Sequence, residues 1–307
     1  MLTNKQLEEI KEHLDRAQNP VFFFDNDADG LCSFLLLRRY LNRGKGVAVK
    51  SFPDLNVSYF RKVLELKADY IFILDKPVVG EDFFKEVEKH NIPTVWIGHH
   101  EITHNEKTPE FVNYYNPNLN KDKSSEPTTF LCYQLTQNQR KEDLWIAVIG
   151  CIADRYIPDF YSDFEKQYPD LTLSSKTKNA FDIFYTSSIG KVARIFSFAL
   201  KDRTTNVINM MKYLISVKNP YEVLDENNKN STMHHRYEQI FKRYSKLLSK
   251  AESVARGSKK ILFFQYGGDL SVSGDLSNEL IYNFPEKTTV VIYVNGAKAN
   301  ISMRGKQ

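Results

Sequence analysis

The segment from Val21 to Gly30, VFFFDNDADG, constrains the fold of this chain more than any other. Four apolar residues precede three aspartates at alternating positions, a pattern typical of a buried strand that ends in a charged pocket. Alternate side chains of an extended backbone point to the same side, so Asp25, Asp27 and Asp29 can converge. Carboxylates that converge repel one another unless cations neutralise them. The segment therefore predicts one or two divalent cations at a strand end.

Two other interpretations of this segment are a calcium-binding EF-hand loop and a solvated acidic turn. An EF-hand loop carries a bidentate glutamate at its last ligand position and follows a helix. Here Leu36 stands at that position and the apolar residues 21–24 precede the loop, so the EF-hand is excluded. The acidic turn stays open on this segment alone, because short motifs also occur by chance.

The composition is that of an ordinary globular protein. The 307 residues suffice for two domains, and 42% of them are hydrophobic and 26% charged. A formal net charge of +4 permits a polyanionic partner without requiring one. Cys32, Cys132 and Cys151 form no Cys-x-x-Cys pair and lie in apolar stretches, which favours a reducing, cytoplasmic location. No apolar run reaches membrane-spanning length, so we expect no membrane contact.

Strands and helices alternate over the first part of the chain. Strands are predicted at residues 21–24, 47–52, 70–74, 94–97 and 111–117. Helical patterns separate the first four of them, which predicts an α/β domain with a doubly wound, mostly parallel sheet. Ligands of such sheets bind beyond the carboxyl ends of the strands.

Further acids and histidines follow this rule. Asp75 comes directly after the 70–74 strand, and His99 and His100 come just after the 94–97 strand. Asp154 follows a wholly apolar helical turn, where a carboxylate is costly unless it is paired or bound to metal. We therefore expect these residues to lie near the aspartate cluster.

The rest of the chain predicts helices followed by a second, smaller α/β domain. Residues 234–257 predict one long helix that connects the two domains, and strand-like segments follow it at 260–266 and 288–294. We expect a metal-binding domain over residues 1–160, a helical region with a linker helix over 161–257, and the smaller domain over 258–307. Basic residues of the long helix either line a nucleic-acid surface or form an ordinary solvated face.

The motifs DNDADG, Asp75 at a strand end, GHH and GCIAD, in this order and at these separations, resemble the DHH phosphoesterase superfamily. That superfamily includes RecJ nucleases, oligoribonucleases and cyclic-dinucleotide phosphodiesterases. The segment SSIGKVARIFSFALKDRTTNVINMM is most similar to archaeal RecJ-type proteins, which are relatives of the replication factor Cdc45. SGDLSNEL and ISMRG resemble the start of the accessory DHHA1 domain, so the resemblance extends over the whole chain.

The resemblance implies a centre with two divalent ions, usually manganese and alternatively magnesium, that share Asp75. The metal ligands that it implies are Asp25, Asp27, Asp29, Asp75, His99 and Asp154, of which Asp25 occupies a variable position. It also implies that His100 contacts the scissile phosphate and that Ser302 and Arg304 lie near the nucleotide. Carboxylate oxygens with one imidazole suit manganese or magnesium better than structural zinc.

The function that the resemblance implies is a two-metal phosphodiesterase, a single-strand-specific exonuclease that releases mononucleotides from DNA or RNA. Two ions that share a carboxylate can activate water and neutralise a phosphate. Two alternatives stay open. One is a non-catalytic scaffold similar to Cdc45, with replication proteins of the GINS type as partners. The other is a phosphodiesterase for nanoRNA or cyclic dinucleotides.

Two features depart from the family pattern. Gly98 stands where the family has aspartate, so we expect weaker orientation of the histidines and weaker metal binding or activity. The glycine-rich motif expected after ISMRG does not occur before Gln307, from which we expect a fragment or a weaker grip on the substrate. A second histidine pair, His234–His235, has no nearby acids and is not expected to bind metal.

Overall fold

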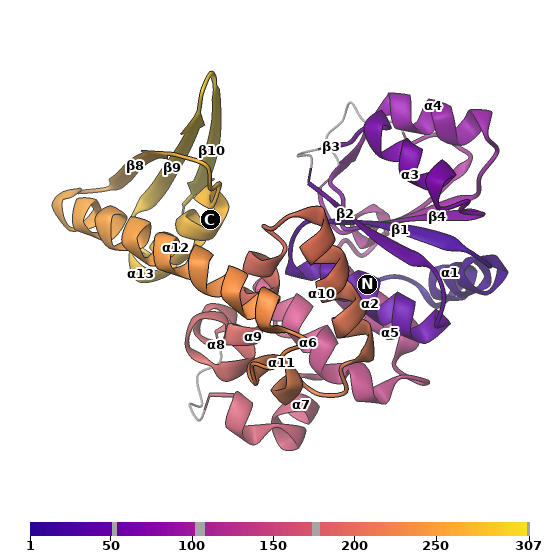
Figure 1. The fold of residues 1–307 in the computed structure, drawn as a ribbon, viewed down its shortest axis with the longest axis horizontal. Helices are drawn as coiled ribbons and strands as arrows, with labels where there is room; N and C mark the ends of the chain where they lie inside the picture. Colours follow the sequence, from indigo (N-terminus) through magenta and orange to yellow (C-terminus); the bar gives the residue numbers. More distant parts are fainter. Residues whose placement is uncertain (51–53, 102–107, 174–178, 306–307) are drawn as a thin grey trace. The chain divides into compact units, whose positions relative to one another are not determined.

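The computed structural model describes residues 1–50, 54–101, 108–173 and 179–305. The chain forms two compact units, Met1–His234 and His235–Gln307 (Figure 1). This division differs from the expected boundaries after residues 160 and 257. The reason is that helices beyond residue 160, such as α9 (Ser188–Ala199), bury their apolar faces against α2 (Ala28–Leu41) and α6 (Leu144–Ala153) of the first unit.

A five-stranded parallel sheet forms the centre of the first unit, as the alternating pattern predicted. The strands follow the order β2-β1-β4-β6-β7, and all four pairings are parallel. Their bounds are β1 (Pro20–Asp25), β2 (Lys45–Val49), β4 (Tyr70–Leu74), β6 (Thr94–Ile97) and β7 (Val112–Tyr115). Residues 51 and 52, predicted to end the second strand, lie outside the described residues. A short parallel pair that was not predicted joins β3 (Asp54–Leu55) and β5 (Val78–Val79).

Helices cover both faces of this sheet (Figure 1). The helices α3 (Phe60–Glu65) and α4 (Glu81–Lys89) pack on one face, and α2 (Ala28–Leu41) packs on the other. In β1, Val21 and Phe23 join the core under α3 and α4, whereas Phe22 and Phe24 contact Phe34 of α2. Because alternate side chains reach opposite apolar layers, the strand is apolar throughout.

The other helices of the first unit surround α2 or lie at the edges of the unit. Their bounds are α1 (Asn4–Arg16), α5 (Thr128–Thr136), α6 (Leu144–Ala153), α7 (Tyr161–Gln167), α8 (Ala180–Thr186), α10 (Thr204–Ser216) and α11 (Pro220–Leu224). Both α5 and α6 pack against α2, which is buried on nearly every side. In the part of the chain that the structure describes, no helix is both long enough and apolar enough to span a membrane.

The second unit contains most of α12 (Ser231–Gly257) and a three-stranded sheet. The strands β8 (Ile261–Gly267), β9 (Thr288–Asn295) and β10 (Lys298–Arg304) follow the order β10-β9-β8. The pairing of β8 with β9 is parallel, and that of β9 with β10 is antiparallel. The helix α13 (Ser273–Asn283) packs against β9 and β10 and buries Leu276 and Leu280. This small α/β unit agrees with the predicted fold class.

Candidate metal centre

Strand ends and helix ends supply the predicted metal ligands of the first unit. Asp25 ends β1, Asp75 directly follows β4, and His99 lies two residues beyond β6. Asp29 lies in the first turn of α2, and Asp154 directly follows α6. Because β1, β4 and β6 are parallel neighbours, their carboxyl ends lie at one edge of the sheet.

His99 lies among three of the predicted carboxylates. Its Nε2 atom is 3.3 Å from an oxygen of Asp75, 3.5 Å from one of Asp154 and 3.7 Å from one of Asp29. Its Nδ1 atom is 3.3 Å from the carbonyl oxygen of Ser125, so Nε2 is the nitrogen that faces the acids. The donor atoms of Asp29, His99 and Asp154 lie within 4.8 Å of one another, which is close enough to share one metal ion.

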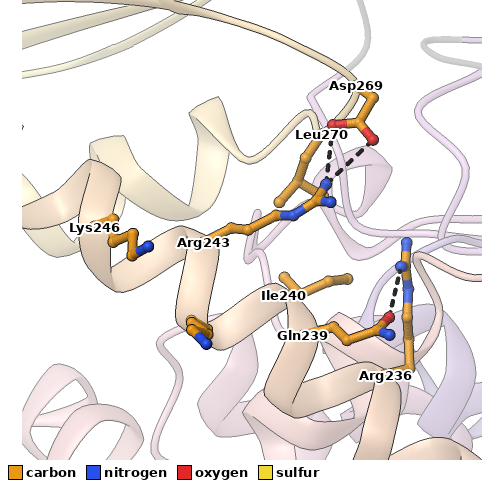
Figure 2. Close-up of a pocket in the computed structure, with 8 residues that line it drawn as sticks. Arg236, Gln239, Ile240, Arg243, Lys246, Asp269 and Leu270 are labelled. Atoms are coloured by element: carbon orange, nitrogen blue, oxygen red, sulfur yellow. Dashed lines mark hydrogen bonds and ion pairs between the residues drawn. The ribbon is translucent and has the colours of Figure 1, made fainter.

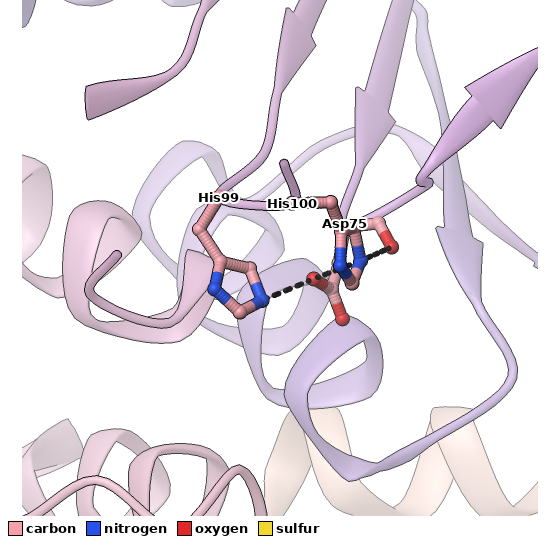
Figure 3. A group of neighbouring side chains, drawn as sticks. All are labelled: Asp75, His99 and His100. Atoms are coloured by element: carbon pink, nitrogen blue, oxygen red, sulfur yellow. Dashed lines mark hydrogen bonds and ion pairs between the residues drawn. The ribbon is translucent and has the colours of Figure 1, made fainter. Parts of the chain in front are cut away.

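His100 contacts the same aspartate from another direction. Its Nε2 atom lies 3.4 Å from Oδ1 of Asp75 and 3.2 Å from the Asp75 carbonyl oxygen. Figure 3 shows both imidazoles turned toward Asp75, and the donor atoms of these three residues also lie within 4.8 Å. The His100 side chain is 35% exposed, against 11% for His99. Of the two histidines, His100 is therefore the more open to a ligand from solvent.

Asp75 has an unusual backbone conformation. Its φ angle is 60°, in the left-handed region that residues with a Cβ atom seldom adopt. The Asp75 N–H donates to the carbonyl oxygen of Ile97 at 2.9 Å, and the Thr128 hydroxyl donates to Asp75 Oδ1 at 3.0 Å. Such outliers concentrate at functional sites, where the surrounding structure holds them.

The N-terminus of α5 holds Asp29. The backbone N–H groups of Thr128 and Thr129 donate to its two carboxylate oxygens at 2.9 and 2.7 Å. These are first-turn donors without a partner in their own helix, and they favour a negative charge. A carboxylate oxygen that accepts one hydrogen bond keeps a lone pair for a cation. Sequence analysis missed both threonines, although Pro127 just before them is a helix-start signal.

Two asparagines fix the backbone of the histidine pair and were also missed. The side-chain amide of Asn118 donates to the His99 carbonyl oxygen at 2.6 Å, and that of Asn116 donates to the His100 carbonyl oxygen at 2.8 Å. No sequence signal marks these two asparagines. A Cβ atom added to Gly98 would meet no heavy atom closer than 3.7 Å, so there is room for the Cβ atom of the aspartate that the family resemblance implies there.

The charges of the centre shift the pKa values of its members. Burial alone would lower the pKa of His99, but hydrogen bonding to Asp75 and the charges of Asp75, Asp29 and Asp154 raise it to about 10. Burial alone would raise the pKa of Asp75, but hydrogen bonds with His100 and His99 lower it. Burial and the Asp75 charge hold the pKa of Asp29 well above its usual range. This concentration of negative charge favours a bound cation.

Asp27 and Asp25 have different partners from the other acids. Asp27 caps α2, since its Oδ1 accepts the Gly30 N–H at 2.9 Å. Desolvation by the surrounding protein, followed by the charges of Asp75 and Asp25, raises the pKa of Asp27 well above its usual range. Much of the Asp27 residue is nevertheless open to solvent. Asp25 pairs with Lys76, whose Nζ atom is 2.9 Å from Asp25 Oδ1. Lys76 was not predicted as part of the site.

Ser302 and Arg304 belong to the second unit, on β10. The Ser302 hydroxyl donates to the Ser273 hydroxyl oxygen at 3.0 Å, and Arg304 Nε donates to Asn278 Oδ1 at 2.8 Å. Both side chains therefore contact α13. Their proximity to a nucleotide stays a prediction.

A basic pocket of about 410 Å³ lies along α12 of the second unit (Figure 2). It is lined by Arg236, Gln239, Ile240, Lys242, Arg243, Lys246, Asp269 and Leu270. Arg243 donates to both carboxylate oxygens of Asp269, at 2.9 and 3.1 Å, and an adjoining pocket extends the lining to Lys250. Because Arg243, Lys246 and Lys250 recur at intervals of three and four residues, they share one face of the helix.

Comparisons with known proteins agree with this fold. Residues 21–154 match the model described as DHH family, N-terminal domain. A search of curated proteins found no match. Several solved structures are similar over nearly the whole chain. RecJ from Thermus thermophilus in complex with Mn²⁺ has a TM-score of 0.69 and 15% identity, over 98% of this chain and 47% of that chain. An exonuclease RecJ bound to manganese has a TM-score of 0.59 and 14% identity, over 99% of this chain and 82% of that chain. Cdc45 from Entamoeba histolytica has a TM-score of 0.55 and 11% identity, over 98% of this chain and 88% of that chain.

The parallel sheet with this acid–histidine cluster at its carboxyl edge is a phosphoesterase fold of the DHH type. Residues 21–154 form a domain of the DHH family, as the motifs predicted, and the fold of the chain is similar to those of RecJ and Cdc45. It spans about half the length of the Thermus RecJ chain.

Proposed function

We propose that this chain is a metal-dependent phosphodiesterase that acts as an exonuclease on single-stranded nucleic acid and releases mononucleotides. The observation that carries the proposal is the convergence of three carboxylates on His99 Nε2, at 3.3 to 3.7 Å. Members of the DHH family are mostly metal-dependent phosphoesterases, and one solved structure of similar fold is an exonuclease bound to manganese.

The donor set fits manganese or magnesium. Asp29, Asp75, Asp154 and His99 would hold the ion, because carboxylate oxygens with one imidazole are typical ligands of these metals. When bound, the ion supplies activation of a water molecule and neutralisation of phosphate oxygens. For the second ion that the family resemblance implies, the remaining acids are Asp25 and Asp27.

The residues around the ligands prepare them for catalysis. The Thr128 hydroxyl and the first N–H groups of α5 hold Asp75 and Asp29 in fixed orientations, so these acids need not reorganise during the reaction. His100 is partly exposed beside Asp75. We assign it the contact with the scissile phosphate, to which its imidazole can donate a hydrogen bond.

The basic pocket on α12 is proposed to bind phosphates of the substrate strand. Lys242, Lys246 and Lys250 are exposed on this helix, and contacts with phosphates dominate the affinity of proteins for nucleic acids. Ser302 and Arg304 are proposed as further nucleotide contacts, since an arginine can bind a phosphate through two N–H groups.

The test is hydrolysis of end-labelled single-stranded DNA and RNA with Mn²⁺, with Mg²⁺ and with EDTA. We expect stepwise shortening that depends on the metal and that the Asp75→Asn variant loses. The matched control is Asp163→Asn on the surface of α7, where the carboxylate is 65% exposed; this variant should retain full activity. If Asp75→Asn hydrolysed the substrate at the wild-type rate, the assignment of the site would be wrong.

A non-catalytic scaffold similar to Cdc45 is the second candidate. It is favoured by Gly98, which stands in the place of the family's aspartate, and by the fold shared with Cdc45. Metal binding without hydrolysis of any oligonucleotide would support the scaffold, and turnover abolished by chelator would exclude it. A length series separates the third alternative, because a phosphodiesterase for short substrates would cleave only the shortest oligonucleotides.

A further inference from the structure

Lys76 places a fixed positive charge inside the metal centre. Its side chain is fully buried, and its Nζ atom lies 2.9 Å from Oδ1 of Asp25. A buried ammonium group is unfavourable unless an anion lies against it. The carboxylate of Asp25 is therefore already paired with a cation of the chain itself, the ammonium group of Lys76.

The donor atoms of the centre form two groups that share His99. Asp29, His99 and Asp154 form one group, Asp75, His99 and His100 form the other, and the donor atoms of each group lie within 4.8 Å of one another. Within the described ranges, neither Asp25 nor Asp27 belongs to such a group of three. The acids that remain for a second ion are Asp27, which caps α2, and Asp25, which is paired with Lys76.

We propose that Lys76 takes the place of the second metal ion, so that this centre binds a single divalent cation through Asp29, Asp75, His99 and Asp154. The ammonium group neutralises part of the acid cluster and repels a second cation by its like charge. The proposal rests on the proposed metal centre and changes the number of ions in it. It departs from the two ions that the family resemblance implies.

The backbone around Lys76 keeps the ammonium group at the centre. The Lys76 carbonyl oxygen accepts a hydrogen bond from Trp96 Nε1 at 3.1 Å. The Trp96 ring in turn stacks on Tyr114, with 4.1 Å between ring centroids. The left-handed conformation of Asp75 sets the path of the chain into Lys76. These contacts fix the start of the lysine side chain, and its ion pair with Asp25 fixes the end.

The experiment is a count of bound Mn²⁺ per chain, by elemental analysis after equilibrium dialysis, together with electron paramagnetic resonance of the same samples. For the wild-type protein we expect one ion and the spectrum of isolated Mn²⁺. Lys76→Met removes the charge and keeps an unbranched side chain, so we expect a second ion and an exchange-coupled spectrum. Lys76→Arg keeps the charge and should remain at one ion.

Two ions in the wild-type protein would overturn the proposal, as would one ion in a folded Lys76→Met variant. Circular dichroism checks that this variant folds, and if it does not, the wild-type count and spectrum decide. Hydrolysis is measured on the same samples. One bound ion without hydrolysis contradicts the proposed function and supports the role of Lys76. Two bound ions with hydrolysis support the proposed function and contradict the role of Lys76. Absence of bound ions in the wild-type protein would overturn both.

Discussion

A single imidazole nitrogen in this centre faces three carboxylates, which makes the site sensitive to one residue. Without His99, Asp29, Asp75 and Asp154 lose the group that lies within 3.3 to 3.7 Å of each. For His99→Ala we expect Mn²⁺ affinity and hydrolysis to fall by more than about 100-fold. Loss of a residue that only hydrogen-bonds to a metal ligand already lowers metal affinity or activity by about 10- to 100-fold. Titration calorimetry and the oligonucleotide assay measure the two effects.

His235→Ala is the matched control for this variant. The His235 side chain is exposed and contacts Gln239 within its own helix, at 2.8 Å. Metal binding and activity should equal those of the wild-type protein. An equal loss in both histidine variants would contradict the assignment of His99 as a ligand.

A second prediction at the residue scale concerns the hydroxyl that faces Asp75. Thr128→Val keeps the shape of the side chain but removes the hydrogen bond of 3.0 Å to a buried carboxylate. We expect the free energy of unfolding in EDTA to fall by about 1–3 kcal/mol, which urea denaturation measures. Thr186→Val, at an exposed helical position, should change it by less than about 0.5 kcal/mol. Equal effects of the two substitutions would contradict a special role for Thr128.

At the scale of elements, Gly150 controls how closely α6 approaches α5. A Cβ atom at this position would lie 2.1 Å from Oγ1 of Thr129, the residue whose N–H holds Asp29. We expect Gly150→Ala to destabilise the protein by about 1–3 kcal/mol through overpacking and to weaken Mn²⁺ binding. Thermal denaturation and metal titration measure the two changes.

Gly274→Ala in α13 is the control for the steric argument. A Cβ atom added there meets nothing within 4 Å, and alanine is favoured over glycine in helices. This variant should be as stable as the wild-type protein or more stable. If Gly150→Ala behaved in the same way, the close approach of α6 and α5 would not support the site.

The elements also show why part of the site could be predicted and part could not. The proximity of Asp75 and His99 could be predicted because strand ends follow from local periodicity, and parallel strands bring their carboxyl ends together. The contact of Thr128 with Asp29 joins residues that are far apart in sequence, and it depends on how α5 packs. Lys76 was missed because a lysine in a sequence is expected at the surface, whereas here it is buried against Asp25.

For the whole molecule, the sequence predicted the fold class better than the division into units. The alternating pattern sufficed for the parallel sheet. The helices beyond residue 160 gave no sign of their partner, because an amphipathic pattern shows that a face is buried and not which element buries it. In the structure α9 packs against α6, so these helices join the first unit.

The distribution of charge over the molecule gives the last prediction. The net charge is only +4, yet exposed lysines gather along one helix of the second unit. If this row of lysines, the stripe on α12, binds phosphates, affinity for single-stranded oligonucleotides must fall with salt concentration. The slope of log affinity against log salt concentration is about −0.7 for each neutralised phosphate. The double variant Lys246→Ala/Lys250→Ala should therefore make the slope shallower by about 1.4, measured by fluorescence anisotropy in EDTA. Lys5→Ala/Lys85→Ala, which removes two exposed lysines from the first unit, should leave the slope unchanged. An equal change in the two double variants would show that net charge, rather than the stripe on α12, attracts the strand.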